Sequence, residues 1–295
     1  MSGLVELARQ AQRAAAETRR LAGVGRDLPI CVFDMAEKLG LEVKFRPETS
    51  LEGMYSRGNP SVILVPALRP PGRQAFSCAH ELGHHVMGHG TKVDEYLADG
   101  RETGRDEPEE GLANSFAAHL LMPVAAVRRA FASRGWDWDA STPEQAFVAS
   151  CYLGVGYDAL INHMHWALRL IGPAQRDKLQ RYSPKQLRLS LLGEAIAGQM
   201  VLVDNAWVGR CVDLSAGDRA ILPAGVRMEG RSIRVLAAGV SRTIVEGVRP
   251  GVSRLESGDG AWAVYVRVAR RDYVGRNRFR FDEDPDENEP SIDHR

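Results

Sequence analysis

Apolar residues recur at helical spacing along the start of the chain. The first 22 residues form an amphipathic stretch rich in alanine and arginine, which ends at the "GVG" that follows. "LPICVFDMAEKLG" then repeats the spacing before a glycine. Both patterns predict helices, because an apolar residue every three to four positions gives a helix one face to bury.

Shorter apolar runs then predict a sheet. "LEVKFR", "GMYSR" and "SVILVP" are candidate strands, the last apolar enough for the sheet interior. "RPPG" breaks the chain before a long helix carrying "FSCAHELGHHVMGHG". The polar stretch 91–110 is typical of a surface loop. Helical spacing resumes in "EPEEGLANSFAAHLLMP", and Pro123 marks a break or a new helix start.

The second half of the chain changes from helical to strand-like. From about Ser141 the pattern is helical, and "ASCYLGVGYDALINHM" predicts a helix, a tight turn and a second helix. Pro184 to Leu192 is the last predicted helix, with Ser183 as its N-cap. After Gly193 the predicted strands are short and valine-rich: "QMVLVD", "RAILP", "SIRVLAAGV", "TIVEGV" and "AWAVYVRVAR".

These patterns predict an α+β chain in four parts. The expected parts are a domain over 1–135 around the histidine-rich helix, a helical, helix-turn-helix-like segment over 136–193, a β-rich domain over 194–281, and an acidic disordered tail over 282–295.

Composition and charge narrow the class of protein. With 295 residues, 44% of them hydrophobic and 26% charged, the chain has an ordinary globular composition and a formal net charge of zero. Because the tail is acidic, the body is net basic, which permits nucleic-acid contact without requiring it. We see no signal peptide and no membrane span, and the four cysteines lack C-x-x-C spacing. A cytoplasmic protein with free thiols and no membrane partner is expected.

His80 and His84 are the centre of the candidate chemistry. Their i, i+4 spacing places both imidazoles on one helix face, directed at one ion. Glu81 can reach a water on that ion but is poorly placed to ligate it. This H-E-x-x-H arrangement is the motif of zinc hydrolases. The alternative is a solvated helix that happens to carry histidines, but the apolar neighbours predict a half-buried helix, and Gly83 allows another element to approach.

The neighbouring histidines are not the expected third ligand. His85 points away from His84, and His89 lies one residue short of the position where metzincins carry their third histidine. Surface or supporting roles are expected for both.

A glutamate from the following helix is the expected third ligand. "EEGLANSF" offers Glu110, with Asn114 one turn on to orient the metal-binding groups. Glu107 and Glu109 compete, but Glu107 precedes a proline and Glu109 points off the Asn114 face. Glu110 could instead be an acid favoured by the helix dipole.

The chemistry follows from these ligands. Two imidazoles and one carboxylate leave a fourth position open for water, on one Zn²⁺ per chain or on another divalent metal such as Mn²⁺. Glu81 would take a proton from the water and hand it to the leaving amine. The residue that steadies the oxyanion is left open among Tyr96, His85, His89 and His119.

The order of these motifs resembles the ImmA/IrrE family of metallopeptidases, over roughly Leu28 to Pro123. The motifs are "LPICVFDMAEKLGLEV", "LEGMYS", "SVILVP", "RQAFSCAHELGHHVMGH" and "EEGLANSFAAHLLMP". The resemblance implies a compact, gluzincin-like zincin domain with His80, His84 and Glu110 as ligands and Glu81 as base. It also implies an endopeptidase that cleaves an Xre-like helix-turn-helix repressor, derepressing a stress, DNA-damage or phage-defence operon.

Cys78 departs from the family, which usually has an aliphatic residue there. A redox-sensitive thiol is one interpretation, and a small buried hydrophobe is the preferred one.

The IrrE-like branch of the family also implies a helix-turn-helix segment followed by a GAF-like sensor. The β-rich region occupies the sensor position. Its "RVARRDYVGRNRFRF" mixes arginines with Tyr273 and Phe279, which suits single-stranded DNA as an activating signal, or equally the exposed face of an edge strand. The alternative function is a DNA-binding transcriptional regulator with a structural or vestigial metal site. The intact Glu81 favours the peptidase, because a structural site would close its fourth position with another ligand.

Overall fold

The computed structural model describes residues 2–95, 108–258, 260 and 262–283. The chain divides into two compact units. The first comprises Met1–Ile196 and Asp272–Arg278, and the second comprises Ala197–Arg271 and Phe279–Arg295. The expected domain over 194–281 differs from this division because residues 272–278 return to the first unit. This division does not test the expected boundary at residue 135, which stays a prediction. The tail beyond residue 283 lies outside the described residues.

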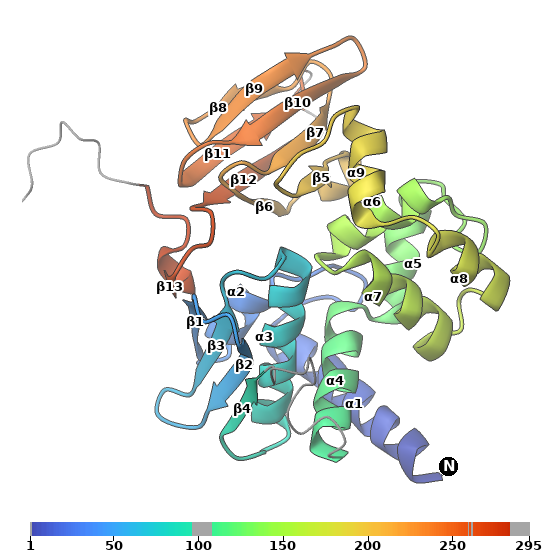
Figure 1. Cartoon of the computed structure of the whole chain (residues 1–295), viewed down its shortest axis with the longest axis vertical. Coiled ribbons are helices and arrows are strands. Elements are labelled where there is room, and N and C mark those ends of the chain that lie inside the picture. The colour runs from blue at the N-terminus through green and yellow to red at the C-terminus, as the bar shows by residue number, and fades with distance from the viewer. Residues whose placement is uncertain (1, 96–107, 259, 261, 284–295) are drawn as a thin grey trace, which may run out of the picture. The chain divides into compact units, whose positions relative to one another are not determined.

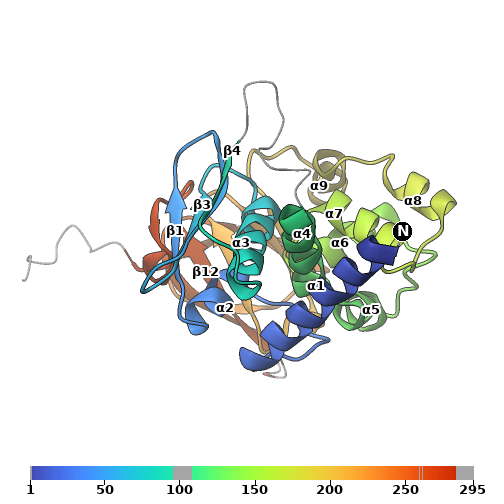
Figure 2. The same ribbon diagram turned by 90° about the horizontal axis from the view of Figure 1, so that it is seen from below.

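A mixed sheet and several helices form the N-terminal part of the first unit. The helices are α1 (Ser2–Leu21), α2 (Val32–Lys38), α3 (Pro71–Val86) and α4 (Pro108–Leu121), and the strands are β1 (Glu42–Arg46), β2 (Leu51–Ser56), β3 (Val62–Pro66), β4 (Lys92–Glu95) and β13 (Gly275–Arg276). Within the described residues the strand order is β13-β1-β3-β2-β4. β1 and β3 are parallel, and the other neighbours are antiparallel. Figure 2 shows α3 between this sheet and α4, with α1 beyond α4.

The sequence patterns explain this arrangement. Buried and partly exposed side chains alternate along β1 and β3, so one face of each strand packs on the core. β3 is central, as its apolar run predicted. α3 begins with Pro71 at its first position, where the missing amide hydrogen costs nothing. β4 was not predicted, because it lies in the stretch 91–110 expected to be a loop, and its one apolar residue, Val93, gives no alternation.

The rest of the first unit is helical. Its elements are α5 (Val124–Ala132), α6 (Pro143–Leu153), α7 (Tyr157–Asn162), the π-helical turn η1 (His163–Ala167), α8 (Pro173–Leu179) and α9 (Pro184–Leu192). The predicted tight turn is confirmed: Gly154, with φ of 71°, ends α6 in the left-handed region before α7 begins. The predicted cap is also confirmed, since the Ser183 side chain accepts from the Gln186 backbone amide in a capping box.

The second unit is built from strands, as expected. They are β5 (Met200–Leu202), β6 (Cys211–Ser215), β7 (Arg219–Pro223), β8 (Arg227–Glu229), β9 (Ile233–Ala238), β10 (Arg242–Gly247), β11 (Gly251–Glu256) and β12 (Ala263–Ala269), with the 3₁₀ turns η2 (Asn205–Trp207) and η3 (Asn277–Phe279, shared with the first unit). Within the second unit the described residues form two sheets, β5-β7-β10-β9 and β6-β12-β11-β8 (Figure 1). Burial alternates along β10, β11 and β12, which indicates one core-facing side for each sheet. The GAF-like fold stays a prediction.

No helix among the described residues is long and apolar enough to cross a membrane.

A short C-terminal segment completes the first unit. Asp272–Arg278 leaves the β-rich part of the chain and places β13 antiparallel to β1. The Tyr273 ring stands edge-on to the Phe45 ring, with centroids 6.1 Å apart. Asn277, 3% exposed, anchors the segment on α2. The sheet that carries the histidine-rich helix therefore depends on residues far along the sequence.

We expect Asn277→Asp to destabilise the protein more than Asn277→Ala. The Asn277 amide donates to Asp34 Oδ1 at 3.2 Å and to Glu37 Oε2 at 3.1 Å. Alanine removes both hydrogen bonds and should cost about 1–3 kcal/mol. Aspartate keeps the shape but places a carboxylate against two others, which adds repulsion at neutral pH. Urea unfolding of the two variants measures the order, and equal stability would contradict this role for Asn277.

Candidate metal centre

The histidine-rich helix α3 turns the face that carries His80 and His84 towards α4. His84 is fully buried, and His80 is 6% exposed. The close approach predicted at Gly83 is present: a Cβ atom there would lie 3.0 Å from Phe116 Cδ1 and 3.3 Å from Ala113 Cα on α4. Because glycine has no side chain, the two helix backbones can come near enough for their polar side chains to meet.

His80, His84 and Glu110 come together between these two helices. The Nε2 atoms of His80 and His84 are 3.0 Å apart, and they lie 3.0 and 3.4 Å from Glu110 Oε2. Tetrahedral zinc with ligands about 2.0–2.1 Å away requires separations of about 3.3 Å between ligand atoms. The triangle of donor atoms is close to that size, and all three side chains are buried. The residues present therefore fit one divalent metal ion.

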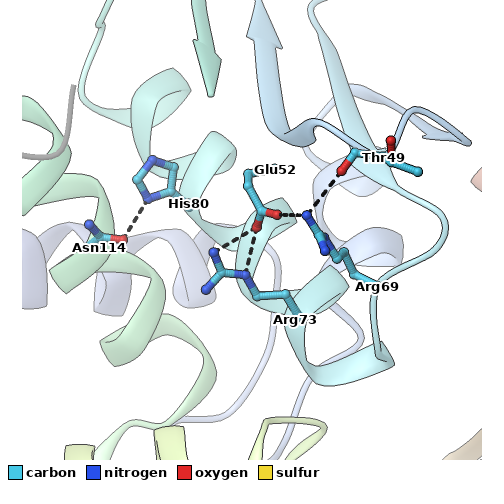
Figure 3. Close-up of polar contacts among 6 residues, drawn as sticks. All are labelled: Thr49, Glu52, Arg69, Arg73, His80 and Asn114. Atoms are coloured by element: carbon cyan, nitrogen blue, oxygen red, sulfur yellow. Dashed lines mark hydrogen bonds and ion pairs between the residues drawn. The ribbon is translucent and has the colours of Figure 1, made fainter. Parts of the chain in front are cut away.

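The second nitrogen of each imidazole has its own partner. His80 Nδ1 lies 3.1 Å from Asn114 Oδ1, and the two side chains point towards each other from α3 and α4 (Figure 3). An amide oxygen only accepts, so His80 Nδ1 donates and its Nε2 is left as a ligand atom. His84 Nδ1 lies 2.8 Å from His89 Nδ1. Both histidines are thereby held with Nε2 directed at the common point.

His89 therefore has a supporting position, which the sequence left as one of two options. After α3 ends, Gly88 adopts a left-handed φ of 74°, and the His89 amide returns to the His84 carbonyl at 3.0 Å. A glycine just past a helix end was the signal that could have placed His89 beside the last turn of α3.

No pattern in the sequence pointed to a role for Tyr55. Its hydroxyl lies 2.9 Å from His85 Nδ1, on the sheet side of α3. Burial and then the charge of Arg57 lower the pKa of His85. His85 is thus held against β2 and directed away from the group formed by His80, His84 and Glu110.

The surroundings of Glu110 lower the pKa of its carboxyl group. Burial alone would raise its pKa, but the adjacent imidazoles of His80 and His84 outweigh burial and hold the pKa far below the usual range. An ionised carboxylate is the form that ligates a cation. The competitor Glu109 occupies the same first turn of α4 without joining this group, and Glu107 lies outside the described residues.

Cys78 has the environment of a buried hydrophobe. Its side chain is fully buried, and burial, followed by the neighbouring Cys31 and Glu81, raises the pKa of the thiol well above its usual value. A neutral, enclosed thiol is a poor nucleophile, which supports the structural interpretation over a redox-sensitive one.

The oxyanion candidates are dispersed. Tyr96 lies outside the described residues. His119 packs edge-on against His163, with ring centroids 5.1 Å apart. Burial lowers the pKa of His119, and burial followed by the nearby His119 lowers the pKa of His163 to about 4. His85 contacts Tyr55, and His89 contacts His84. None of the four candidates is therefore assigned the oxyanion role.

Comparison with known proteins covers the same part of the chain. Residues 30–162 match the model of peptidase family M78, described as the IrrE N-terminal-like domain. No curated protein matches the chain. Among solved structures, a Mycobacterium tuberculosis transcriptional regulator is similar at 22% identity with a TM-score of 0.32. The likeness covers 58% of this chain and 49% of that one, so this chain spans about half of that protein's length.

We expect metal content to follow the three converging side chains. His84→Ala and Glu110→Ala should lose a stoichiometric metal, because two remaining donors bind weakly and leave buried polar groups unsatisfied. The adjacent residues give matched controls, His85→Ala and Glu109→Ala, which should keep it. Elemental analysis of the purified variants measures this, and full metal content in Glu110→Ala would refute the assignment.

Asn114→Ala should weaken metal binding without abolishing it. Loss of the acceptor frees the His80 ring to rotate and to change tautomer. Removal of such a partner costs about 10–100-fold in affinity. Competition with a chromogenic chelator gives the dissociation constant, and an unchanged value would show that Asn114 does not orient His80.

Proposed function

We propose that this chain, whose residues 30–162 form an IrrE N-terminal-like domain of peptidase family M78, is a metal-dependent endopeptidase that cleaves a helix-turn-helix repressor. The observation that carries the proposal is the buried triangle of His80, His84 and Glu110. Three protein ligands leave the fourth tetrahedral coordination position open for a water, as in hydrolytic rather than structural zinc sites.

The metal is proposed to be zinc, one ion per chain, with another divalent metal such as Mn²⁺ as the alternative. Two imidazoles and a carboxylate suit Zn²⁺, whereas a site built only from oxygen donors would favour harder cations. An ion held there supplies a Lewis acid that makes water nucleophilic near neutral pH.

Side chains of this protein would transfer the protons and orient the metal ligands. Glu81, next to His80 and 1% exposed, is the proposed base. Its carboxylate would accept a proton from the attacking water and then donate that proton to the nitrogen of the leaving amine. Asn114 and His89 would keep the two ligand imidazoles oriented throughout.

The substrate is proposed from the family resemblance. An Xre-like repressor cleaved at one site would couple the peptidase to a stress, DNA-damage or phage-infection response. A helix-turn-helix protein encoded next to the gene for this chain is the substrate to test first.

The β-rich second unit is proposed to receive the signal. Single-stranded DNA was suggested by the arginine-rich stretch, but several of these arginines have partners within the chain. Arg267 forms a bidentate pair with Asp213 at 2.6 and 2.7 Å and lies 4.5 Å from the Phe281 ring centre. Arg276 pairs with Glu42 at 2.6 Å. A nucleic acid would have to replace these contacts, so a small molecule is an equal candidate.

The alternative function, a DNA-binding regulator, has limited support from the helix-turn-helix-like segment. The exposed residues of α7 are Asp158, Ala159 and Asn162. A recognition helix usually presents basic side chains to the phosphates, and this short helix presents an acid instead.

Glu81→Gln should keep the metal and the fold but lose most of the repressor cleavage. The amide cannot accept the proton of the attacking water, and loss of a general base costs about 10²–10⁴-fold in rate. Glu109→Gln changes a nearby acid in the same way and should cleave normally. Gel analysis with the candidate repressor, together with elemental analysis, measures both properties. Cleavage by Glu81→Gln at the wild-type rate would remove Glu81 as the base.

A further inference from the structure

Strand β2 contains a bulge beside the proposed base. Its register with β4 pairs Leu51 with Glu95 and Gly53 with Asp94, so Glu52 has no residue opposite it. Successive residues of a regular strand point to opposite faces. An extra residue breaks this alternation and can turn two neighbours to one side. Here Glu52 and Gly53 both meet α3, at two different points along the helix.

Gly53 meets α3 at the side chain of Glu81. A Cβ atom on Gly53 would lie 2.1 Å from Glu81 Oε1 and 3.0 Å from its Cδ. The first distance is far inside van der Waals contact, so any side chain at position 53 would displace the carboxylate. The backbone of Gly53 is not in the left-handed region, so its conformation suits any residue. The space taken by Glu81 is thus what requires glycine here.

Glu52 meets α3 at its first turn. Its Oε2 accepts from Arg73 Nε at 3.0 Å and from Arg73 Nη2 at 2.8 Å (Figure 3). Its Oε1 pairs with Arg69, which also donates to the Thr49 carbonyl at 3.2 Å. Glu52 is 5% exposed, so these ion pairs are partly shielded from water. They also offset the unfavourable position of Arg73 at the positive end of the helix dipole.

The two contacts together fix β2 along the axis of α3. Arg73 and Glu81 are eight residues apart, which is about 12 Å of helix. The ion pairs at one end set the register of strand and helix, and Gly53 leaves the room for the carboxylate at the other. A shift of the strand by one residue would bring a side chain against Glu81.

We propose that this bulge positions the base: Gly53 and Glu52 are positioning residues that hold the Glu81 carboxylate at the metal centre. The consequence for catalysis rests on the proposed function. The consequence for packing does not, so the two are tested separately.

The packing is tested by thermal unfolding of four proteins: wild type, Gly53→Ala, Glu81→Ala and the double variant. Gly53→Ala should lower the melting temperature by about 4–8 °C when Glu81 is present. The same substitution should lower the melting temperature by less than half as much when residue 81 is alanine, because the added methyl then has space. Gly111→Ala is the matched control, since a Cβ there would have no atom of the described residues within 4 Å, and it should cause no loss. Equal losses from Gly53→Ala in both backgrounds, or failure of the double variant to fold, would overturn the proposal.

The effect on catalysis is tested with the same helix-turn-helix protein as substrate. Gly53→Ala should reduce kcat by about 100-fold, as misplacement of a reacting group by about 1 Å does, with KM changed by less than about twofold and metal content unchanged. In the Glu81→Gln background it should cause no further loss. Glu52→Gln should reduce kcat by about tenfold, whereas Glu48→Gln, in an exposed pair with Arg46, should not.

A wild-type kcat in Gly53→Ala would overturn the proposal. Lack of cleavage by the wild-type protein would count against the proposed function instead, and the unfolding cycle would still decide whether Gly53 acts through Glu81.

Discussion

The contact between α3 and α4 at Gly83 is the constraint on which the candidate site depends. His80 and His84 come from one helix and Glu110 from the other, so their donor atoms meet only if the two backbones are close. At Gly83 the neighbouring atoms of Phe116 and Ala113 already occupy the space of a side chain. On its other side α4 is held by α1, where the buried Arg19 donates to the Leu120 carbonyl at 2.6 Å (Figure 2). α4 is therefore fixed from both sides.

Burial of several polar groups in one place explains why the arrangement implies function. Imidazoles and carboxylates removed from water are costly unless each atom has a partner. Here Asn114 and His89 take the outer nitrogens, and the remaining donor atoms of His80, His84 and Glu110 face one another. A divalent cation is the partner that satisfies all three at once. Strand β2 adds a different constraint, because it must leave space for the Glu81 carboxylate. The bulge at Glu52 and Gly53 provides that space.

Local spacing predicted much of this from the sequence. The i, i+4 histidines, Glu110 with Asn114, the need for glycine at position 83 and the order of helices and strands all depend on neighbours within a turn or on periodicity. The features that were missed depend on distant partners. The bulge exists only relative to β4, whose polar residues gave no strand signal. Likewise, β13 is a two-residue strand that forms only because β1 offers an edge. The pairing of His89 with His84 required the left-handed turn at Gly88, which spacing along a helix does not capture.

We propose that His80, His84 and Glu110 hold one metal ion with one position left for water. X-ray absorption spectroscopy of the zinc-loaded protein tests this coordination. We expect nitrogen and oxygen scatterers at about 2.0–2.2 Å and two imidazoles among four ligands. A sulfur scatterer at about 2.3 Å, or a third imidazole completing a closed shell of protein ligands, would contradict it.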